Sequence, residues 1–162
     1  MAVTGVALFF VYRPTAGQAW SGLVDGPLTA ELEVARAVRV VHRLAAQLAM
    51  WTAVAAGALL VLRRAGGRRW VAPAIGAGVV VAVGLASFTG YLLPWDQLAL
   101  WRVRVGSSVA GYRPLFGPDV RFVLLGGVEV SPGTVLGWLA VHSLVLGPLA
   151  VVLVAAALRR PR

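Results

Sequence analysis

The sequence contains no cysteine and no lysine, and it has only two histidines. Without cysteine the chain has no disulfide, no thiolate metal site, no iron–sulfur ligation and no thioether-attached haem. Charged residues make up 13% of the chain, which is roughly half the share in soluble domains. This shortage of charge excludes an ordinary soluble globular protein.

Hydrophobic residues make up 59% of the 162 residues, and the mean hydropathy is +0.83. The fifteen basic residues, all arginine, outnumber six acids and give a formal net charge of +9. Basic nucleic-acid-binding proteins are not this apolar, so we expect no nucleic-acid partner. A membrane protein with arginines at the ends of its spans explains both numbers. The length predicts a single domain over residues 1–162.

Three stretches are long and apolar enough to cross a bilayer as helices: 38–62, 70–93 and 135–158. A fourth apolar stretch, 2–12, reaches only about half the bilayer at 1.5 Å per residue. It lacks the basic segment that begins a signal peptide, which leaves the end of a longer helix as the alternative. The sequence therefore predicts an all-α membrane protein, a four-helix transmembrane bundle with a shortened first helix.

Arginine counts predict the orientation of these spans. The connection 63–69 contains four arginines and no acid, and the C-terminus adds Arg159, Arg160 and Arg162. All six acids lie in the connections 13–37 and 94–133. The positive-inside rule then places the C-terminus in the cytoplasm of a multi-pass plasma-membrane protein. In the outward connection, residues 98–105 form an amphipathic stretch that we expect to lie on the membrane surface.

The two histidines fall inside spans, where ionisable residues are functional candidates. With the predicted orientation, His42 and His142 lie at similar depth and can ligate one haem iron from opposite sides. Arg39 lies one turn from His42 on the same face and is placed to meet a haem propionate, while Gly90 lets a flat macrocycle approach the backbone. The alternative is structural, because an intramembrane histidine often hydrogen-bonds a neighbouring helix and transmembrane helices are rich in glycine.

Four segments carry a resemblance to a known family. Residues 88–97 read FTGYLLPWDQ, 39–43 read RVVHR, and further matching positions lie in 4–20 and 126–148. The first string resembles the signature after the third helix of cytochrome b in quinol–cytochrome c oxidoreductases. The order and spacing of the other segments agree with the four-helix, N-terminal part of that family. The chain is thus similar to a cytochrome b N-terminal domain.

The resemblance implies a role for each matching residue. His42 and His142 match the axial ligands of the family's outer b-type haem, and Arg39 matches its propionate-binding arginine. Gly5 and Gly90 match the two glycines that pack against that haem. The implied cofactor is a non-covalent b-type haem with two histidine ligands.

The segment 88–97 matches the border of the family's quinol-oxidation pocket, which makes Tyr91, Pro94 and Trp95 candidate border residues. The alternative is a helix ended by proline and flanked by interfacial aromatic residues; both interpretations can hold together. The Pro-Glu-Trp-Tyr motif that completes the family's pocket does not occur in this sequence. A complete pocket therefore requires another chain.

Several positions depart from the family pattern. The family's inner-haem histidines lie fourteen residues beyond the outer ones, where this chain has Ala56 and Ala156. Gly76 matches the inner-haem glycine of the third helix, but a glycine alone binds nothing. An arginine expected five residues before the second ligand is Gly137 here. We therefore expect one haem.

The first functional hypothesis is a mono-haem cytochrome subunit that transfers electrons between quinol and an outward-facing partner in a bc-like respiratory complex. The expected partners are quinol, membrane lipid, a second membrane subunit and a periplasmic-side redox protein; a homodimer is left open. The second hypothesis is a structural membrane anchor, haem-poor or haemless, for a periplasm-facing oxidoreductase. Action as an enzyme alone is disfavoured, because the spans contain no acid–base pair or nucleophile constellation.

Overall fold

The computed structural model describes residues 1–21, 30–62, 70–108, 125 and 130–159. Within these ranges the chain is helical and contains no strand. The helical segments are α1 (Ala2–Val11), α3 (Ala30–Leu62), α4 (Val71–Leu92), α5 (Gln97–Ser108), α8 (Pro132–Ala140), η3 (Val141–Leu146) and α9 (Gly147–Leu158). The all-α expectation is confirmed for this part of the chain, and α1 is the expected short N-terminal helix.

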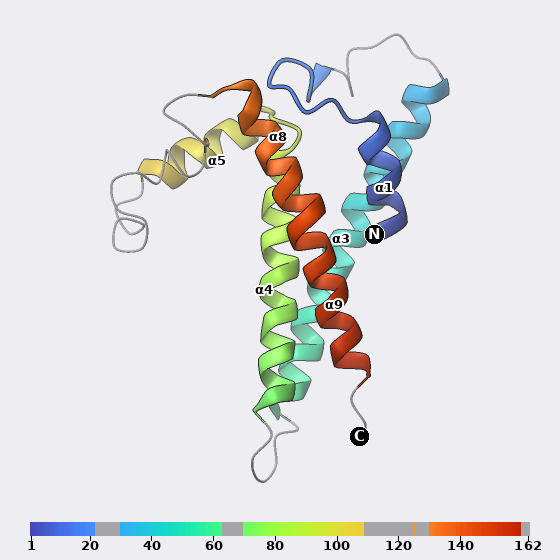
Figure 1. Cartoon of the computed structure of the whole chain (residues 1–162), viewed down its shortest axis with the longest axis vertical. Coiled ribbons are helices and arrows are strands. Elements are labelled where there is room, and N and C mark those ends of the chain that lie inside the picture. Colours follow the sequence, from blue (N-terminus) through green and yellow to red (C-terminus); the bar gives the residue numbers. More distant parts are fainter. Residues whose placement is uncertain (22–29, 63–69, 109–124, 126–129, 160–162) are drawn as a thin grey trace.

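Helix α4 lies at the centre of the arrangement and packs against α3, α5, α8, η3 and α9 (Figure 1). Its buried face is built mainly from small residues, which let neighbouring helices approach closely in the absence of a hydrophobic driving force. These residues recur every three or four positions: Gly76, Val79, Ala82, Val83, Ala86, Thr89 and Leu92. Helix α1 packs on α3 near the upper end of the bundle in Figure 1.

Two helices of the described part of the chain are long and apolar enough to cross a membrane: Val71–Leu92 and Gly133–Leu158. Only 22% and 11% of their most apolar windows are buried inside the chain, which is the opposite of a core helix in a soluble protein. The helix Val71–Leu92 covers the expected span 70–93 except its end residues, and Gly133–Leu158 contains the expected span 135–158. The four-span bundle as a whole stays a prediction.

The remaining expected span, 38–62, lies inside α3, which is not one of those two helices. Helix α3 is continuous over 33 residues and begins at Ala30, eight residues before the expected start. Its first half carries Arg36, Arg39 and Arg43, so charge accumulates toward one end of the helix. The expectation that 13–37 is wholly a connection is therefore wrong for its last residues.

Helix α5 leaves the bundle at the upper end and runs sideways from it (Figure 1). Ala99 and Val103 are buried, whereas Leu98 and Trp101 are 61% and 58% exposed. The expected stretch 98–105 thus lies within a helix; its amphipathic character stays a prediction. The exposed apolar face is suited to a membrane surface.

Two hydrophobic clusters lie one below the other in the bundle. The upper cluster joins the end of α4 to α5 and to the start of α8; its buried members are Ala19, Leu92, Trp95, Ala99, Val103, Leu125 and Val135. The middle cluster joins α3, α4 and α9; its buried members are Ala53, Val79 and Val83. The candidate site described below lies between them.

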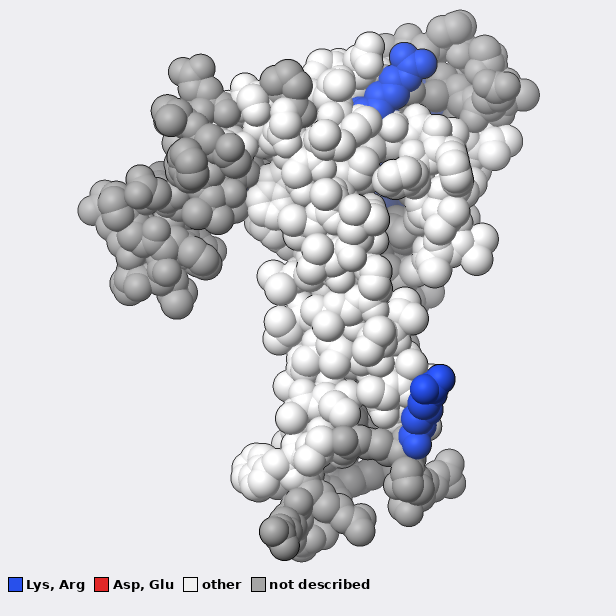
Figure 2. All heavy atoms as spheres, viewed as in Figure 1, with Lys and Arg blue, Asp and Glu red and all other residues white. Residues whose placement is uncertain are grey.

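Charge is concentrated at the two ends of the molecule. On the face drawn in Figure 2, arginine side chains appear near both ends, and most of the surface between them is uncharged. Arg159 ends α9 at the lower end. The arginine-rich connection 63–69, Arg160 and Arg162 lie outside the described residues, so the predicted orientation remains an expectation.

Candidate metal centre

The fold brings together the two histidines, which are one hundred residues apart in the sequence. His42 lies in α3 and His142 in η3, and the centroids of their rings are 6.3 Å apart with an interplanar angle of 68°. Both residues are partly buried. The two imidazoles are therefore neighbours, packed edge to face, and their role as ligands of one haem stays a prediction.

Each imidazole is held by a threonine through its Nδ1 atom. The Thr4 hydroxyl lies 2.9 Å from Nδ1 of His42, and the Thr89 hydroxyl lies 3.0 Å from Nδ1 of His142. Each hydroxyl also donates to a backbone carbonyl of its own helix, with Thr4 bonding the oxygen of Met1 at 2.9 Å. Since a hydroxyl has one proton, both threonine oxygens are left to accept a hydrogen bond from the imidazole Nδ1–H.

This arrangement selects one tautomer on both sides. An imidazole that donates from Nδ1 carries its lone pair on Nε2. In metal sites, the hydrogen bond made by the nitrogen that does not bind the metal orients the histidine ring. Neither Nε2 atom forms a hydrogen bond with the residues that the structure describes. Both Nε2 atoms are therefore available as metal ligands.

Two glycines pack directly against the imidazoles. A Cβ on Gly90 would lie 3.1 Å from Cε1 of His142, and a Cβ on Gly5 would lie 3.4 Å from Cε1 of His42. A Cβ at Gly90 would force the ring to shift by a few tenths of an ångström, whereas a Cβ at Gly5 would lie at about van der Waals contact distance. The two predicted glycines thus lie beside the predicted ligands, one on α4 and one on α1.

The helix that carries His142 is widened into a π-helix over Val141–Leu146. The backbone N–H of Gly147 donates to the carbonyl of His142, in place of the usual i→i−4 pairing. Pro148 follows; it has no N–H and its ring clashes with the carbonyl four residues earlier. Single π turns of this kind occur often at functional sites. The sequence analysis missed this feature, whose signal was the Gly-Pro pair inside an apolar span.

Arg39 and the candidate quinol-border residues lie above the histidine pair. The Arg39 guanidinium lies 5.8 Å from the centroid of the Trp20 ring. Trp95 is buried in the upper cluster and adopts a positive φ of 49°, which is uncommon for a residue with a side chain. Tyr91 is only partly buried and faces Gln47, whose Nε2 lies 3.3 Å from its hydroxyl. The roles of Arg39, Tyr91, Pro94 and Trp95 stay predictions.

The end of α1 is tied to the end of α4 beside this region, because the Tyr12 hydroxyl donates to the carbonyl of Leu93. Asp96 accepts a 2.8 Å hydrogen bond from the backbone of Ala99 and so caps the start of α5. These contacts fix the segment between α4 and α5 above the histidines.

Within the described ranges, no group of three or more His, Cys, Asp or Glu could hold a metal ion, so the histidine pair is the site to consider there.

A helical bundle with two histidines in contact between its helices is the arrangement expected of a membrane cytochrome. Comparison with known proteins gives the family. The family described as Cytochrome b/b6/petB matches residues 1–159. The chain belongs to this cytochrome b family, whose members are haem-binding membrane proteins of bc-type electron-transport complexes.

Individual relatives agree. Cytochrome b6 of Tupiella akineta is 32% identical over 155 residues, covering 92% of this chain and 69% of the relative. Cytochrome b6 of Prochlorococcus marinus (strain MIT 9215) is 32% identical over 154 residues, covering 88% of this chain and 65% of the relative. The chain thus spans about two thirds of the length of these relatives.

A solved structure supports the fold. A chain of a structure titled "Hyperthermophilic respiratory Complex III" matches with a TM-score of 0.68 and 21% sequence identity. The match covers 97% of this chain and 42% of that chain. At this identity the likeness establishes a shared fold, and it leaves the activity of this chain to its own residues.

Proposed function

We propose that this chain is a mono-haem b-type cytochrome subunit that transfers electrons between quinol and an outward-facing redox partner. The observation that carries the proposal is the pair of imidazoles, 6.3 Å apart and each held at Nδ1 by a threonine. Two imidazoles that bind one metal ion each place a nitrogen about 2 Å from it, so their ring centroids lie about 6 Å apart. The described residues therefore fit a metal held between His42 and His142.

The residues at and around the histidine pair have three different roles in binding the proposed haem. His42 and His142 supply the two axial nitrogens, and Gly5 and Gly90 keep both rings free of steric crowding. Arg39, one turn from His42, supplies a cation for a carboxylate of the cofactor. A b-type haem with two histidine ligands has no open coordination position and supplies one-electron transfer.

The count of one haem is supported by the ligands and by the packing. The chain has two histidines in total, and both are used at this site. The middle cluster, with Ala53, Val79 and Val83 at its centre, packs α3, α4 and α9 together farther along the bundle than the histidine pair. Gly76 packs against α3, since a Cβ on Gly57 would lie 3.8 Å from the Gly76 carbonyl oxygen. Without a second haem this chain cannot carry electrons across the whole bilayer.

The quinol and the partners are part of the proposal. Tyr91, Pro94 and Trp95 border the region above the histidine pair, where the family resemblance places quinol oxidation. The Pro-Glu-Trp-Tyr motif, which in the family completes the quinol pocket, does not occur in this sequence, so we infer that a second membrane subunit completes the pocket. A redox protein on the outer side accepts or donates the electron, and pairing with a second copy of the chain remains open.

The test is a reduced-minus-oxidised spectrum with haem quantitation on the purified full chain. We expect a b-type band at one haem per chain, and we expect it to disappear in His42→Ala and in His142→Ala. Leu144→Ala is the matched control, because Leu144 lies in the same π segment and is 69% exposed. Absence of haem from the wild type, or two haems per chain, would refute the proposal.

The same preparation separates the carrier from the structural anchor. A carrier is reduced when quinol and the partner subunits are supplied, whereas an anchor retains its haem in the oxidised state or binds none. Reduction within the turnover time of the complex supports electron transfer. Bound haem that quinol never reduces would instead establish the anchor function.

A further inference from the structure

Two arginines bracket Tyr91 at the upper end of the bundle. The guanidinium carbon of Arg43, on α3, lies 5.7 Å from the centroid of the Tyr91 ring, and that of Arg102, on α5, lies 5.0 Å from it. The two guanidinium carbons therefore lie no farther apart than the sum of these distances. Three different helices converge at this point, and Arg43 and Arg102 are both exposed.

No carboxylate of the described residues neutralises this pair. The ion pair among those residues joins Arg36 to Glu33 at 3.3 Å. Asp96 accepts a hydrogen bond from the backbone N–H of Ala99, and none of the described carboxylates forms an ion pair with Arg43 or Arg102. Two guanidinium groups held near one ring repel each other, and cation–π contacts with one tyrosine offset only part of that cost. An anion between them would remove the repulsion and complete the site.

The position of the pair indicates the source of the anion. Arg102 lies on α5, whose exposed Leu98 and Trp101 suit a membrane–water interface. Beside and below Arg43 on α3, Leu44 (the next residue) and Leu48 (five residues on) are 54% and 67% exposed and present apolar surface. A cationic pair directly above exposed apolar surface matches a lipid, with its headgroup at the arginines and its acyl chains below.

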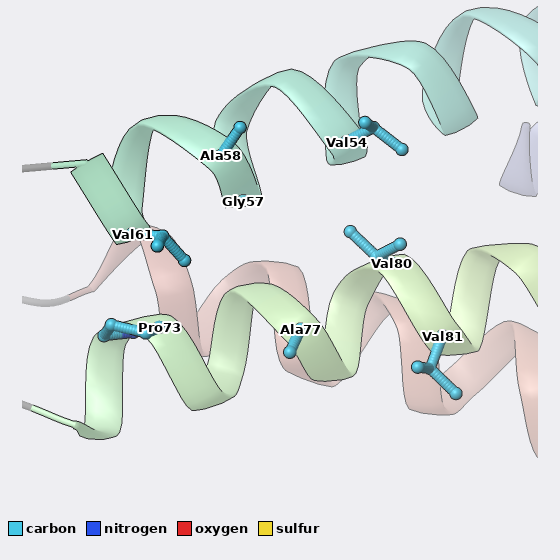
Figure 3. Close-up of a pocket in the computed structure, with 8 residues that line it drawn as sticks. All are labelled: Val54, Gly57, Ala58, Val61, Pro73, Ala77, Val80 and Val81. Atoms are coloured by element: carbon cyan, nitrogen blue, oxygen red, sulfur yellow. The ribbon is translucent and has the colours of Figure 1, made fainter.

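The face of α3 that carries Arg43 continues into an apolar groove. Figure 3 shows this groove between α3 and α4; it has a volume of about 260 Å³ and is lined by Val54, Gly57, Ala58, Val61, Pro73, Ala77, Val80 and Val81. Val54 follows Arg43 by eleven residues, about three turns or roughly 16 Å along the same face. One acyl chain covers half of the hydrocarbon core, about 15 Å, and so reaches the near end of the groove.

We propose that Arg43, Arg102 and Tyr91 bind the phosphate group of an acidic phospholipid at this end of the bundle. The two guanidinium groups donate to the phosphate oxygens, for which their planar geometry is suited. Gln47 donates to the Tyr91 hydroxyl, which leaves the tyrosine proton free to bond a phosphate oxygen. This site goes beyond the electron-transfer function and does not depend on bound haem.

The test measures the lipids that the full chain retains through purification in a mild detergent. The Arg43→Gln/Arg102→Gln double variant removes both cations and preserves side-chain length; Arg13→Gln, an exposed arginine at the same end, is the control. By mass spectrometry we expect phosphatidylglycerol on the wild type and on the control, and at least roughly tenfold less on the double variant. Equal retention by the double variant would overturn the proposal.

Three further measurements distinguish a lipid site from a haem-binding role of the arginines and from a site for free phosphate. Haem content should be unchanged in the double variant; loss of haem with normal lipid retention would mean that the arginines serve the cofactor, which overturns the lipid site. His42→Ala should lose haem and retain the lipid, so the two proposals fail separately. Inorganic phosphate at millimolar concentration should not displace the lipid, and displacement would assign the site to the free ion.

Discussion

At the residue scale, the two threonines determine what the histidine pair can do. Thr4 and Thr89 each accept from an imidazole Nδ1 while donating to a carbonyl of their own helix. The side chains thus link the helix backbone to the Nδ1 side of each ring. Partners of this kind are commonly as important as the ligands for metal affinity.

Thr89→Val tests this role, because valine keeps the shape of threonine and removes the hydroxyl. We expect haem affinity to fall by roughly 10–100-fold, the usual effect of losing the partner of a ligating histidine. The measurement is haem titration of the apoprotein, together with the midpoint potential of the bound haem. Thr89→Ser should restore both values, and an unchanged affinity in Thr89→Val would show that the hydroxyl does not position His142.

The glycines next to the rings predict a graded series. Gly90→Ala would place a Cβ 3.1 Å from Cε1 of His142, Gly5→Ala would place one 3.4 Å from Cε1 of His42, and Gly137→Ala meets nothing within 4 Å. Overpacking of this kind costs about 1–3 kcal/mol. We therefore expect haem occupancy and Tm to fall most in Gly90→Ala and less in Gly5→Ala. Gly137→Ala is the control and should lose neither; equal losses in all three would contradict the steric explanation.

At the element scale, the π-helix of η3 determines where His142 points. A π turn accommodates one residue more than an α turn. If this segment were α-helical instead, the residues on its two sides would be rotated relative to each other about the helix axis, and His142 would no longer keep its position against α4. Pro148 favours the wider turn by withholding an N–H and by its ring. The position of the second ligand thus depends on a residue one and a half turns farther along the chain.

Pro148→Ala tests this dependence by giving back the backbone N–H. We expect the segment to revert toward α-helix, because proline inside a helix costs about 3 kcal/mol relative to alanine. Helicity by circular dichroism should stay equal or rise, whereas haem occupancy should fall because His142 is displaced. Pro73→Ala, in the first turn of α4, is the matched control. Normal occupancy in Pro148→Ala would show that the π turn follows from other contacts.

The long apolar helices and the meeting of the two histidines could be predicted, because both follow from where apolar runs begin and end in the sequence. Apolar runs predict α4 and α9, and the similar depth of His42 and His142 below the predicted outer ends of their spans predicts that they meet. The early start of α3 at Ala30 was missed, because its charged first turns resemble a connection. The threonine contacts were missed because a threonine in an apolar helix usually bonds its own backbone, and only packing decides whether it also reaches a ring.

At the scale of the whole molecule, the proposed single haem at one end of the bundle would make the orientation of the chain in the membrane decisive for its function. The upper end holds the histidine pair, Tyr91 and α5, whereas the lower end holds Arg159. A carrier of this kind exchanges electrons on the side that its upper end faces. The arginine count predicts that this side is the outside of the cell and that the C-terminus is cytoplasmic.

The absence of cysteine makes this orientation directly testable. Gln18→Cys introduces a thiol at an exposed position after α1, and Arg162→Cys introduces one at the other end of the sequence. A membrane-impermeant maleimide should label Gln18→Cys in intact cells, because that residue faces outward, and should label Arg162→Cys only after lysis. The unmodified chain is the control, since it has no thiol to react. Labelling of Arg162→Cys but not Gln18→Cys in intact cells would reverse the topology and place the haem next to the cytoplasm, where an outward-facing redox partner cannot reach it.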